Sequence, residues 1–577
     1  MFYKIIQKLN NGDNMSFEEN KKILLKHKKE IILKFIISVI LNVLLLTIPI
    51  YYSKTIDSLS ASNFHEAYVM LIVLGTLTFF YRVSEIFNQK SYYYLFMNLY
   101  KSYMNEGLIK THNNSLYSLS RFSLSEYSNI MSEDFELISD YYSTLIIRIV
   151  EIFQFLFIIV YFFIINKSIG IITLIISIFV ICLLIFSNKL ISKTNLERKL
   201  RNDKRISLFQ EIFLSLKTIK GFNIFSVIKK RTNNTVDDYI KWHTKLNVDR
   251  YNLRQLSLGI VDIFKVISLG IGIKLIINGQ MTLGTITLIY NYYTKLSELF
   301  TSIIILSESA TNKKVANSRI YKLFQYAKRR EIDNSNYNDV SGNITFDNIL
   351  YGNKMTPILR NVSFNIKKNS FNILTGSMKN CEGVFDLLLR YNREHSGLIL
   401  IDDVDINNYS MDNISSIIGF VMEYPNFFNT SIKDNLLMFD SNFENIVNVC
   451  KYLDIYDYIM NLENGFETIL VDNASNIDTD IKYMLAFATV FLKKSKIILL
   501  NNIFDKVSGS FKRKIEEILV GLKKEHTIIM ISRDVKLLSK DYIDQVILFS
   551  MGDIIGSGVH EKLMEKNEKY CAFIEKM

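Results

Sequence analysis

The sequence predicts a helical membrane domain followed by a soluble α/β domain. The chain has 577 residues, which is more than a single hydrophobic core organises. Its apolar residues concentrate before about residue 310, in segments as long as a bilayer is thick. After about residue 342, short β-branched runs alternate with helical stretches, which is typical of an α/β domain.

The composition favours a membrane surface over nucleic acid as the partner of the basic residues. The chain carries 68 Lys and Arg against 57 Asp and Glu, a formal net charge of +11. Because the basic residues flank the apolar segments, we expect them at the cytoplasmic membrane face, with the lipid bilayer and no nucleic acid as partner. The cysteines show neither metal-ligand spacing nor a disulfide framework, which predicts no metal site and a reducing compartment. The first apolar segment follows about 30 polar residues and is too long for a signal-peptide core, so it is expected to stay as an anchor.

Six apolar segments are long enough to cross a bilayer as helices. A spanning helix needs about 20 mostly apolar residues, because it rises about 1.5 Å per residue across about 30 Å of hydrocarbon. The connections after the second and fourth segments exceed 50 residues, which predicts long helices that project into the cytoplasm. The predicted spans are approximately 31–52, 67–87, 143–165, 169–186, 256–277 and 283–306.

Basic residues orient these spans. A cluster of basic residues precedes the first span, namely Lys21, Lys22, Lys26, Lys28 and Lys29. Further lysines and arginines lie between Lys189 and Arg205 after the fourth span, so both segments are expected in the cytoplasm. The chain is therefore expected to be a multi-pass protein of the plasma membrane with both termini cytoplasmic. The predicted parts are an N-terminal cytoplasmic segment 1–30, a six-span domain 31–313, a linker 314–341 and a soluble domain 342–577.

Several stretches occur in the order found in one protein family. The membrane part contains LLLTIPIYYSKTI at 44–56, EIFLSLKTIKGFNIF at 211–225 and LIINGQMTLGT at 275–285, and the soluble part contains ILRNVSFNI at 358–366 and SGLILIDDVDI at 396–406. Together they resemble an exporter-type half-transporter of the ABC family, in which six spans precede one nucleotide-binding domain. The resemblance covers almost the whole chain. It implies an ABC-type α/β fold, ATP and magnesium as cofactors, and the pairing of two halves.

The family's phosphate-binding loop falls on residues 376–384, which read GSMKNCEGV. Such a loop needs glycines so that backbone N–H groups can curl around phosphate, then a lysine for the β- and γ-phosphates and a hydroxyl for magnesium. Gly376 is retained, but Glu382 stands at the lysine position and Gly383 at the hydroxyl position. Repulsion between a carboxylate and phosphate at about 4 Å costs roughly 4 kcal/mol. Lys379 is the alternative cation, if it reaches back from the loop.

The resemblance places the other functional positions on residues that lack the expected chemistry. Asn501 and Asn502 stand where a magnesium-ordering aspartate and a general-base glutamate are implied, and a neutral amide does not take a proton from water. The signature loop, which offers a hydroxyl and glycine amides to the γ-phosphate, falls on Asp478, Thr479 and Asp480. We expect an architecture that is retained and a side-chain chemistry that is lost. The remaining positions are Glu423 for the switch glutamine, Arg533 for the switch histidine, Asn353 for the base-stacking aromatic and Ser508 for the D-loop aspartate.

Four predicted spans carry an acid and a base three residues apart, which places both on the same helical face. Charges at membrane depth normally face a water-filled interior or each other. One interpretation is a polar central cavity for an amphipathic substrate such as a peptide. The other is ordinary ion pairs on cytoplasmic extensions of the helices. The pairs are Arg82 with Glu85, Arg148 with Glu151, Asp262 with Lys265, and Lys295 with Glu298.

The favoured hypothesis is a catalytically degenerate exporter subunit that binds no ATP or magnesium by itself. The resemblance implies that each ATP site combines the phosphate loop of one subunit with the signature loop of the other, so a heterodimer with a more intact half is expected. Segments 117–124 and 217–225 are expected to couple the two domains by docking near residues 423–428. The alternatives are a non-transporting receptor, immunity or scaffold protein on the same fold, and a working ATPase with unusual residues.

Overall fold

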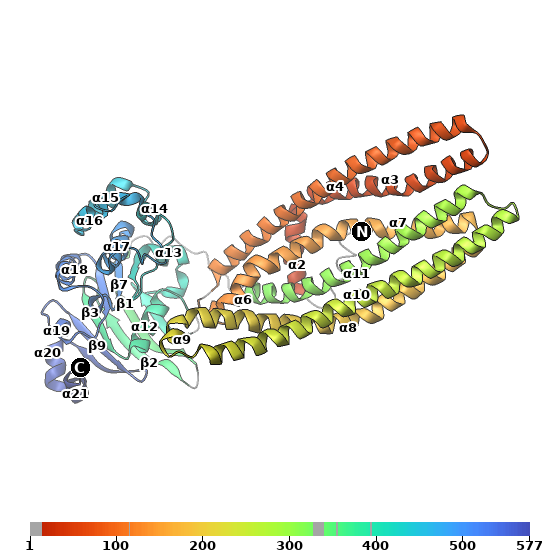
Figure 1. The fold of residues 1–577 in the computed structure, drawn as a ribbon. Coiled ribbons are helices and arrows are strands. Elements are labelled where there is room, and N and C mark those ends of the chain that lie inside the picture. The colour runs from red at the N-terminus through yellow and green to blue at the C-terminus, as the bar shows by residue number, and fades with distance from the viewer. Residues whose placement is uncertain (1–13, 115, 327–339, 354–355, 393–394, 577) are drawn as a thin grey trace. The chain divides into compact units, whose positions relative to one another are not determined.

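The computed structural model describes residues 14–114, 116–326, 340–353, 356–392 and 395–576. The chain divides into two compact units near residue 328. The first unit is helical and the second is α/β (Figure 1). This order of elements confirms the predicted fold class.

Long helices dominate the first unit, and each of the predicted spans lies within one of them. Helix α3 lies beside α4, and α8 lies beside α10 (Figure 1). The long helices are α3 (Lys28–Ser60), α4 (Phe64–Asn113), α7 (Phe135–Ile165), α8 (Lys167–Leu214), α10 (Phe225–Ile277) and α11 (Leu283–Tyr326). The short elements are α2 (Asn14–Lys26), α5 (Leu116–Leu119), α6 (Leu124–Asn129), the π-helical turn η1 (Ile130–Asp134) and α9 (Leu216–Gly221).

Three helices of the described chain are both long enough and apolar enough to cross a membrane. They cover Lys28–Ser60, Phe64–His112 and Glu126–Ile165, and a shorter apolar helical stretch covers Lys167–Leu183. The predicted spans on α10 and α11 carry charged side chains and stay predictions. The first unit is thus a multi-pass helical domain.

Polar side chains fix the turns that join these helices. Asn166 ends α7 and also begins α8, where its side chain accepts a hydrogen bond from the N–H of Ser168 at 2.9 Å. The Asp57 carboxylate near the end of α3 accepts a 2.7 Å hydrogen bond from the Gly284 N–H at the start of α11. A Cβ atom at Gly284 would lie 2.1 Å from the Ser53 carbonyl oxygen, so only glycine allows this approach. Asn166 thus joins two consecutive helices, and the contact of Asp57 with Gly284 joins two helices that are far apart in the sequence.

The predicted linker 314–341 is wrong in its first part, because α11 continues to Tyr326. The lysines and asparagines of this stretch suggest a polar segment, but its apolar residues recur at helical spacing. They pack into a core cluster with α4, α7 and α2, so burial extends the helix. The residues of this stripe are Ala316, Ile320, Leu323 and Phe324. Residues 327–339 of the predicted linker lie outside the described residues.

Two sheets form the framework of the second unit. The smaller sheet has the antiparallel order β2-β1-β4-β5, and the larger has the order β10-β9-β3-β8-β7-β6. In the larger sheet, β9, β3, β8, β7 and β6 pair in parallel, and β10 is antiparallel to β9. The strands are β1 (Ile344–Gly352), β2 (Pro357–Ile366), β3 (Phe371–Gly376), β4 (His395–Ile401), β5 (Val404–Asp405), β6 (Ile418–Val421), β7 (Ile497–Asn501), β8 (Thr527–Ile531), β9 (Gln545–Ser550) and β10 (Asp553–Gly558).

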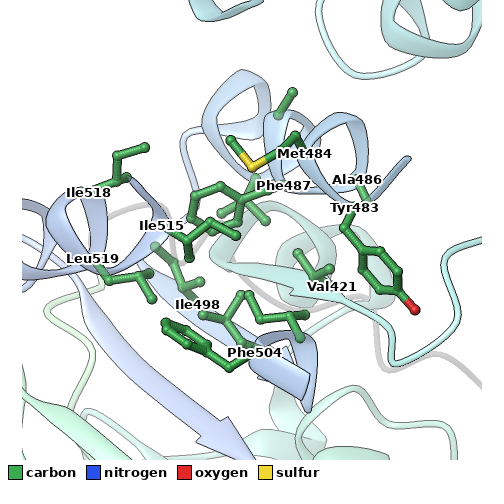
Figure 2. Close-up of a cluster of buried hydrophobic side chains, with 14 of the residues drawn as sticks. Val421, Tyr483, Met484, Ala486, Phe487, Ile498, Phe504, Ile515, Ile518 and Leu519 are labelled. Atoms are coloured by element: carbon green, nitrogen blue, oxygen red, sulfur yellow. The ribbon is translucent and has the colours of Figure 1, made fainter. Parts of the chain in front are cut away.

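Helices pack against the larger sheet. Figure 2 shows Met484 and Phe487 of α17 gathered with Ile515 of α18 and Ile498 of β7 in one buried cluster. Helix α12 belongs to a second buried cluster, with the smaller sheet. The helices are α12 (Met378–Leu388), α13 (Met411–Ile417), α14 (Ile432–Leu437), α15 (Phe443–Tyr452), α16 (Tyr456–Met460), α17 (Thr479–Lys493), α18 (Gly509–Leu522), α19 (Val535–Leu538), α20 (His560–Lys566) and α21 (Glu568–Glu575), with short η2 (Ile406–Asn408), η3 (Gly465–Glu467) and η4 (Ile503–Asp505).

Candidate functional site

The larger sheet brings three of the predicted site segments to one edge. Gly376 ends β3, Asn501 ends β7, and Arg533 comes shortly after β8. Parallel strands end at the same edge of a sheet, which is where α/β folds bind ligands. The structure therefore brings these three segments together at one edge.

The segment predicted to be a phosphate-binding loop is mostly helix. Helix α12 begins at Met378, directly after the N-cap residue Ser377. The N–H groups of Asn380 and Cys381 both donate to the Ser377 carbonyl oxygen, at 3.0 and 3.1 Å. The expectation that this part keeps the family's loop architecture is therefore wrong. With no glycine between Gly376 and Gly383, the chain closes hydrogen bonds along its own helix and leaves fewer N–H groups for an anion.

Gly376 serves strand packing. Its φ is +97°, and a Cβ atom there would lie 2.2 Å from the carbonyl oxygen of Phe549 on β9. The next residue, Ser377, donates its N–H to the same oxygen at 2.9 Å. Asn380 then fixes the first turn of α12, because its amide donates to the Ile358 carbonyl at 2.6 Å and accepts from the Gly552 N–H at 3.1 Å. Lys379 is exposed on this turn.

Two carboxyl groups lie one helical turn apart on α12. Glu382 is half-buried and accepts a hydrogen bond of 3.4 Å from the Asn501 amide. Burial raises the pKa of Asp386; the 3.3 Å hydrogen bond from the Tyr351 hydroxyl opposes this and the charge of Glu382 adds to it. At Gly383, a Cβ atom would lie 2.7 Å from Cγ2 of Ile358. The face where phosphate would bind is thus acidic and closely packed.

Asn501 and Asn502 continue from the end of β7. Asn502 is buried and adopts a left-handed conformation, with φ of +50°, which asparagine tolerates better than most residues. Its side-chain amide donates to Oε1 of Glu423 at 3.2 Å. Both asparagine side chains therefore donate to carboxylates: Asn501 to the phosphate-loop position and Asn502 to the switch position.

The signature positions form the start of α17. Asp478 is the N-cap residue, and its Oδ1 accepts from the N–H of Asp480 at 2.8 Å across Thr479. Oδ1 of Asp480 accepts from the N–H of Ser508 at 2.8 Å. Each carboxylate thus accepts a hydrogen bond from a backbone N–H of the same chain.

The remaining positions lie at the margin of this edge. Arg533 is exposed, and its charge acts on Cys381. Burial raises the pKa of the Cys381 thiol to about 12; Arg533 opposes this rise and Glu382 adds to it. Asn353 follows β1 and is exposed.

The four charge pairs predicted in the helical unit all form within their own helices. The nitrogen–oxygen distances are 2.8 Å for Arg82 with Glu85, 2.8 Å for Arg148 with Glu151, 3.0 Å for Lys265 with Asp262 and 2.8 Å for Lys295 with Glu298. Arg148 also donates to the hydroxyl of Ser302 on α11 at 2.6 Å. Each pair partly neutralises its own charge. Both interpretations, a polar cavity and ordinary ion pairs, are consistent with this geometry.

Sequence reasoning missed two buried charged clusters in the helical unit. The Lys34 ammonium on α3 donates to the carbonyl and side-chain oxygens of Asn88 on α4, at 2.8 and 2.7 Å. Asp134 of η1 is fully buried and forms a bidentate ion pair with Arg319 of α11, at 2.6 and 2.8 Å. A lysine inside an apolar run is a signal for the first cluster. The partners themselves lie too far away in the sequence to be recognised.

An apolar cavity of about 340 Å³ opens on the second unit beside the switch position. It is lined chiefly by hydrophobic side chains from the segment after β6, from α14 and from α17. These include Met422, Pro425, Phe427, Phe428, Met438 and Val490. The predicted docking region 423–428 therefore borders a hydrophobic hollow.

Comparisons with known proteins show what the helical unit is similar to. A family model described as "ABC transporter transmembrane region" matches residues 31–299. The lactococcin-G-processing and transport ATP-binding protein of Lactococcus lactis is 26% identical over 386 residues, which are 66% of this chain and 54% of that protein. An uncharacterized ABC transporter ATP-binding protein of Bacillus subtilis is 25% identical over 390 residues, covering 65% of this chain and 66% of that protein. The chain thus spans about half to two thirds of the curated relatives it matches.

A solved structure matches the whole fold. A bacterial Atm1-family ABC exporter with ATP bound has a TM-score of 0.84, with 16% sequence identity, and covers 95% of this chain and 98% of its own. The chain therefore has the fold of an ABC exporter half-transporter, a multi-pass ABC transmembrane domain fused to an α/β domain of the nucleotide-binding type.

Proposed function

We propose that this chain is a catalytically degenerate subunit of an ABC-type membrane exporter that pairs with a more intact half-transporter. One observation carries the proposal: where the phosphate-binding loop is required, α12 begins at Met378 and presents Glu382. The N–H groups of Asn380 and Cys381 are used within the helix and are not offered to phosphate. The Glu382 carboxylate adds repulsion of roughly 4 kcal/mol at about 4 Å. Together these effects remove micromolar affinity.

The metal and base positions support the same proposal. Magnesium prefers carboxylates and phosphates as ligands, and a general base has to accept a proton from water. Asn501 and Asn502 supply neutral amides that donate to Glu382 and Glu423. These residues do not fit a magnesium nucleotide, so this chain lacks the groups for a hydrolytic step.

Pairing with a different subunit follows from the way that two such halves share their ATP sites. In a homodimer of this chain, both sites would contain a Glu382 loop. With an intact partner, one site would contain the partner's phosphate loop facing Asp478 and Asp480 of this chain. These carboxylates accept local hydrogen bonds at 2.8 Å but remain anionic, so they oppose the γ-phosphate. We expect slow ATP hydrolysis in the pair.

A peptide-like or amphipathic substrate is the class that the helical unit suits best. Charge pairs such as Arg148 with Glu151 give an apolar helix bundle polar sites inside its apolar spans. The Lactococcus lactis relative is described as a processing and transport protein for lactococcin G. The direction proposed is out of the cell.

A second candidate function is a non-transporting receptor, immunity or scaffold role on the same fold. The internal bonding of Asn501, Asn502 and Asp480 favours it, because a fixed domain needs no nucleotide cycle. The two functions differ in whether a partner hydrolyses ATP in the complex.

The experiment is reconstitution of this chain alone and with the half-transporter that co-purifies with it from native membranes. We expect no ATPase activity from this chain alone and low activity from the pair, abolished when the partner's catalytic glutamate is replaced by glutamine. Hydrolysis by this chain alone contradicts the proposal, as does activity in the pair that survives the replacement. Recovery of the chain without a second half-transporter favours the non-transporting role.

A further inference from the structure

Residues 421–428 are here called the switch segment. They begin at the end of β6, line part of the apolar cavity and include Glu423. Three groups of the same chain contact the carboxylate or carbonyl of Glu423. Lys506, which follows η4, places its ammonium 3.2 Å from Oε1 of Glu423. The Asn502 amide donates to the same oxygen at 3.2 Å. The acidic side chain therefore has a cationic partner within its own domain.

Tyr424 adds a second contact to the same ammonium. The Lys506 Nζ atom donates to the Tyr424 hydroxyl at 3.2 Å and lies 4.7 Å from the centre of its ring. One cation thus binds two consecutive residues of the switch segment, by charge, by hydrogen bond and by its position over an aromatic face.

Helix α17 holds the segment from another side. The Tyr483 hydroxyl donates to the main-chain carbonyl oxygen of Glu423 at 2.7 Å. Figure 2 shows the Tyr483 ring at the margin of the buried cluster, with its hydroxyl pointing away from Met484 and Phe487. Because Tyr483 belongs to α17 and Lys506 to the turn after β7, the segment is bound to two separate elements.

We propose that Lys506 is an internal cation that holds the switch segment in one conformation without any nucleotide. The residues that make these contacts are here called the clamp, and they are Glu423, Tyr424, Tyr483, Asn502 and Lys506. Its members stand at or beside the positions where a family member would respond to ATP.

Within the clamp, the pair of Lys506 with Glu423 is half-buried, whereas Tyr424 is 64% exposed. The side chains of Lys506 and Glu423 are only 26% and 21% exposed. An exposed pair between long side chains contributes little, because solvent screens it and both side chains lose freedom. The Lys506 ammonium contacts both the Glu423 carboxylate and the Tyr424 hydroxyl, and it lies over the Tyr424 ring. The Glu423 carboxylate also accepts a hydrogen bond from the buried Asn502 amide. The shared contacts make the removal of Lys506 more costly than the loss of a single pair.

The inference builds on the proposed function but is tested without nucleotide, so that the two can fail separately. The measurement is hydrogen–deuterium exchange of the full chain in lipid nanodiscs. The reporters are the N–H groups of Phe427 and Phe428, which donate to the side chains of Asn473 and Asn435 at 2.8 and 2.9 Å. The variant Lys506→Met removes the charge and keeps the apolar stem.

We expect Lys506→Met to accelerate exchange of these two N–H groups about 10-fold, while strand β3 stays protected. The matched control is Lys540→Met, which removes a lysine paired with Glu516 at 3.0 Å outside the clamp and is expected to change nothing at residues 421–428. The double charge reversal Glu423→Lys with Lys506→Glu is expected to recover most of the protection. Exchange equal to that of the unmodified chain in Lys506→Met overturns the clamp.

Two further results keep the test decisive. If Lys506→Met also loses protection in β3, Glu423→Gln replaces it, because glutamine keeps the shape and removes the charge; unchanged exchange there likewise overturns the clamp. If millimolar Mg-ATP changes exchange in the unmodified chain while Lys506→Met still accelerates it, the clamp stands and the proposed loss of nucleotide binding fails.

Discussion

The carboxylate of Asp480 accepts a hydrogen bond from the backbone N–H of Ser508 at 2.8 Å, joining the start of α17 to the start of α18. By resemblance to the ABC family, Asp480 belongs to the signature loop and Ser508 to the D-loop, two loops of the ATP site. Here they bind each other within one chain. The same pattern recurs at Asn501 with Glu382, where a former phosphate position is bound by a neighbouring side chain.

The first prediction is that the chain alone binds no Mg-ATP at millimolar nucleotide, because α12 engages the N–H groups and Glu382 repels phosphate. Isothermal titration calorimetry of the full chain in detergent measures this. The variant Glu382→Lys is also expected to show no binding with a dissociation constant below about 100 μM, because the helix still begins at Met378. Saturable binding by the unmodified chain below that concentration contradicts the prediction.

The second prediction concerns the coupling segments 117–124 and 217–225 in the assembled complex. Phe222 and Phe225 are 77% and 64% exposed, and the cavity beside Phe428 is hydrophobic, so burial of these rings is expected to drive docking. Cysteines at Phe222 and Phe428 are expected to crosslink under mild oxidation. A cysteine at Met551, on the turn between β9 and β10, is the control for random collision. Absence of crosslinks from either segment, in every register, rules the docking out.

The third prediction is that Asp134→Asn strongly destabilises the helical unit. The change leaves the Arg319 guanidinium beside a neutral amide in a site where Asp134 is fully buried, which is expected to cost about 3–5 kcal/mol. The comparison is Glu211→Gln, which breaks an exposed pair with Arg231 and is expected to cost at most about 1 kcal/mol. Thermal unfolding in detergent, followed by the fluorescence of the single tryptophan, ranks the two variants. Equal effects would show that burial does not decide the outcome.

The fourth prediction is an acid-sensitive contact at the start of the second unit. The Asp402 carboxylate accepts from the N–H and hydroxyl of Ser341 and from the N–H groups of Gly342 and Asn343. Partial burial acts to raise the pKa of Asp402, but these hydrogen bonds outweigh it and lower the pKa below its ordinary value. The stabilisation is therefore fully present above the unfolded pKa of about 3.9 and is lost as pH falls through the lower folded pKa.

At neutral pH, Asp402→Asn is expected to cost about 1 kcal/mol, since the hydrogen bonds to a charged acceptor are partly exposed to solvent. Thermal unfolding at pH 7 and near pH 3 measures the effect, which should shrink at the lower pH. The neighbouring Asp403→Asn keeps a residue type that tolerates the left-handed backbone and should behave like the unmodified chain. A cost that is the same at both pH values would exclude the charge as its source.

The elements that sequence alone predicts are those set by local pattern. Apolar runs placed each long helix of the first unit. The three-residue spacing of Arg82 with Glu85 and of its counterparts placed both charges on one helical face, where they pair. The assignment of the site positions rests on the spacing of the family and stays a prediction. The order of the two domains, helical first and α/β second, could also be predicted from the sequence.

What the sequence did not reveal depends on contacts between distant residues. The early start of α12 depends on Asn380 reaching Ile358 and Gly552, and the extension of α11 depends on burial of Leu323 and Phe324. The partnership of Lys34 with Asn88 spans two helices. In each case a tertiary contact decides the local structure, and no local periodicity records it.

The connection between α7 and α8 consists of Asn166 alone, which ends one helix and begins the next. Asp57 likewise fastens the end of α3 to the start of α11. Helices that share a fixed end can rotate only about that end, so the displacement of one against its neighbour grows with distance from the turn. The turn at Asn166 and the contact of Asp57 with Gly284 are therefore the points about which these helices pivot. An insertion of two or three residues at Asn166 would free α7 and α8 to slide past each other, a movement that the present chain does not permit.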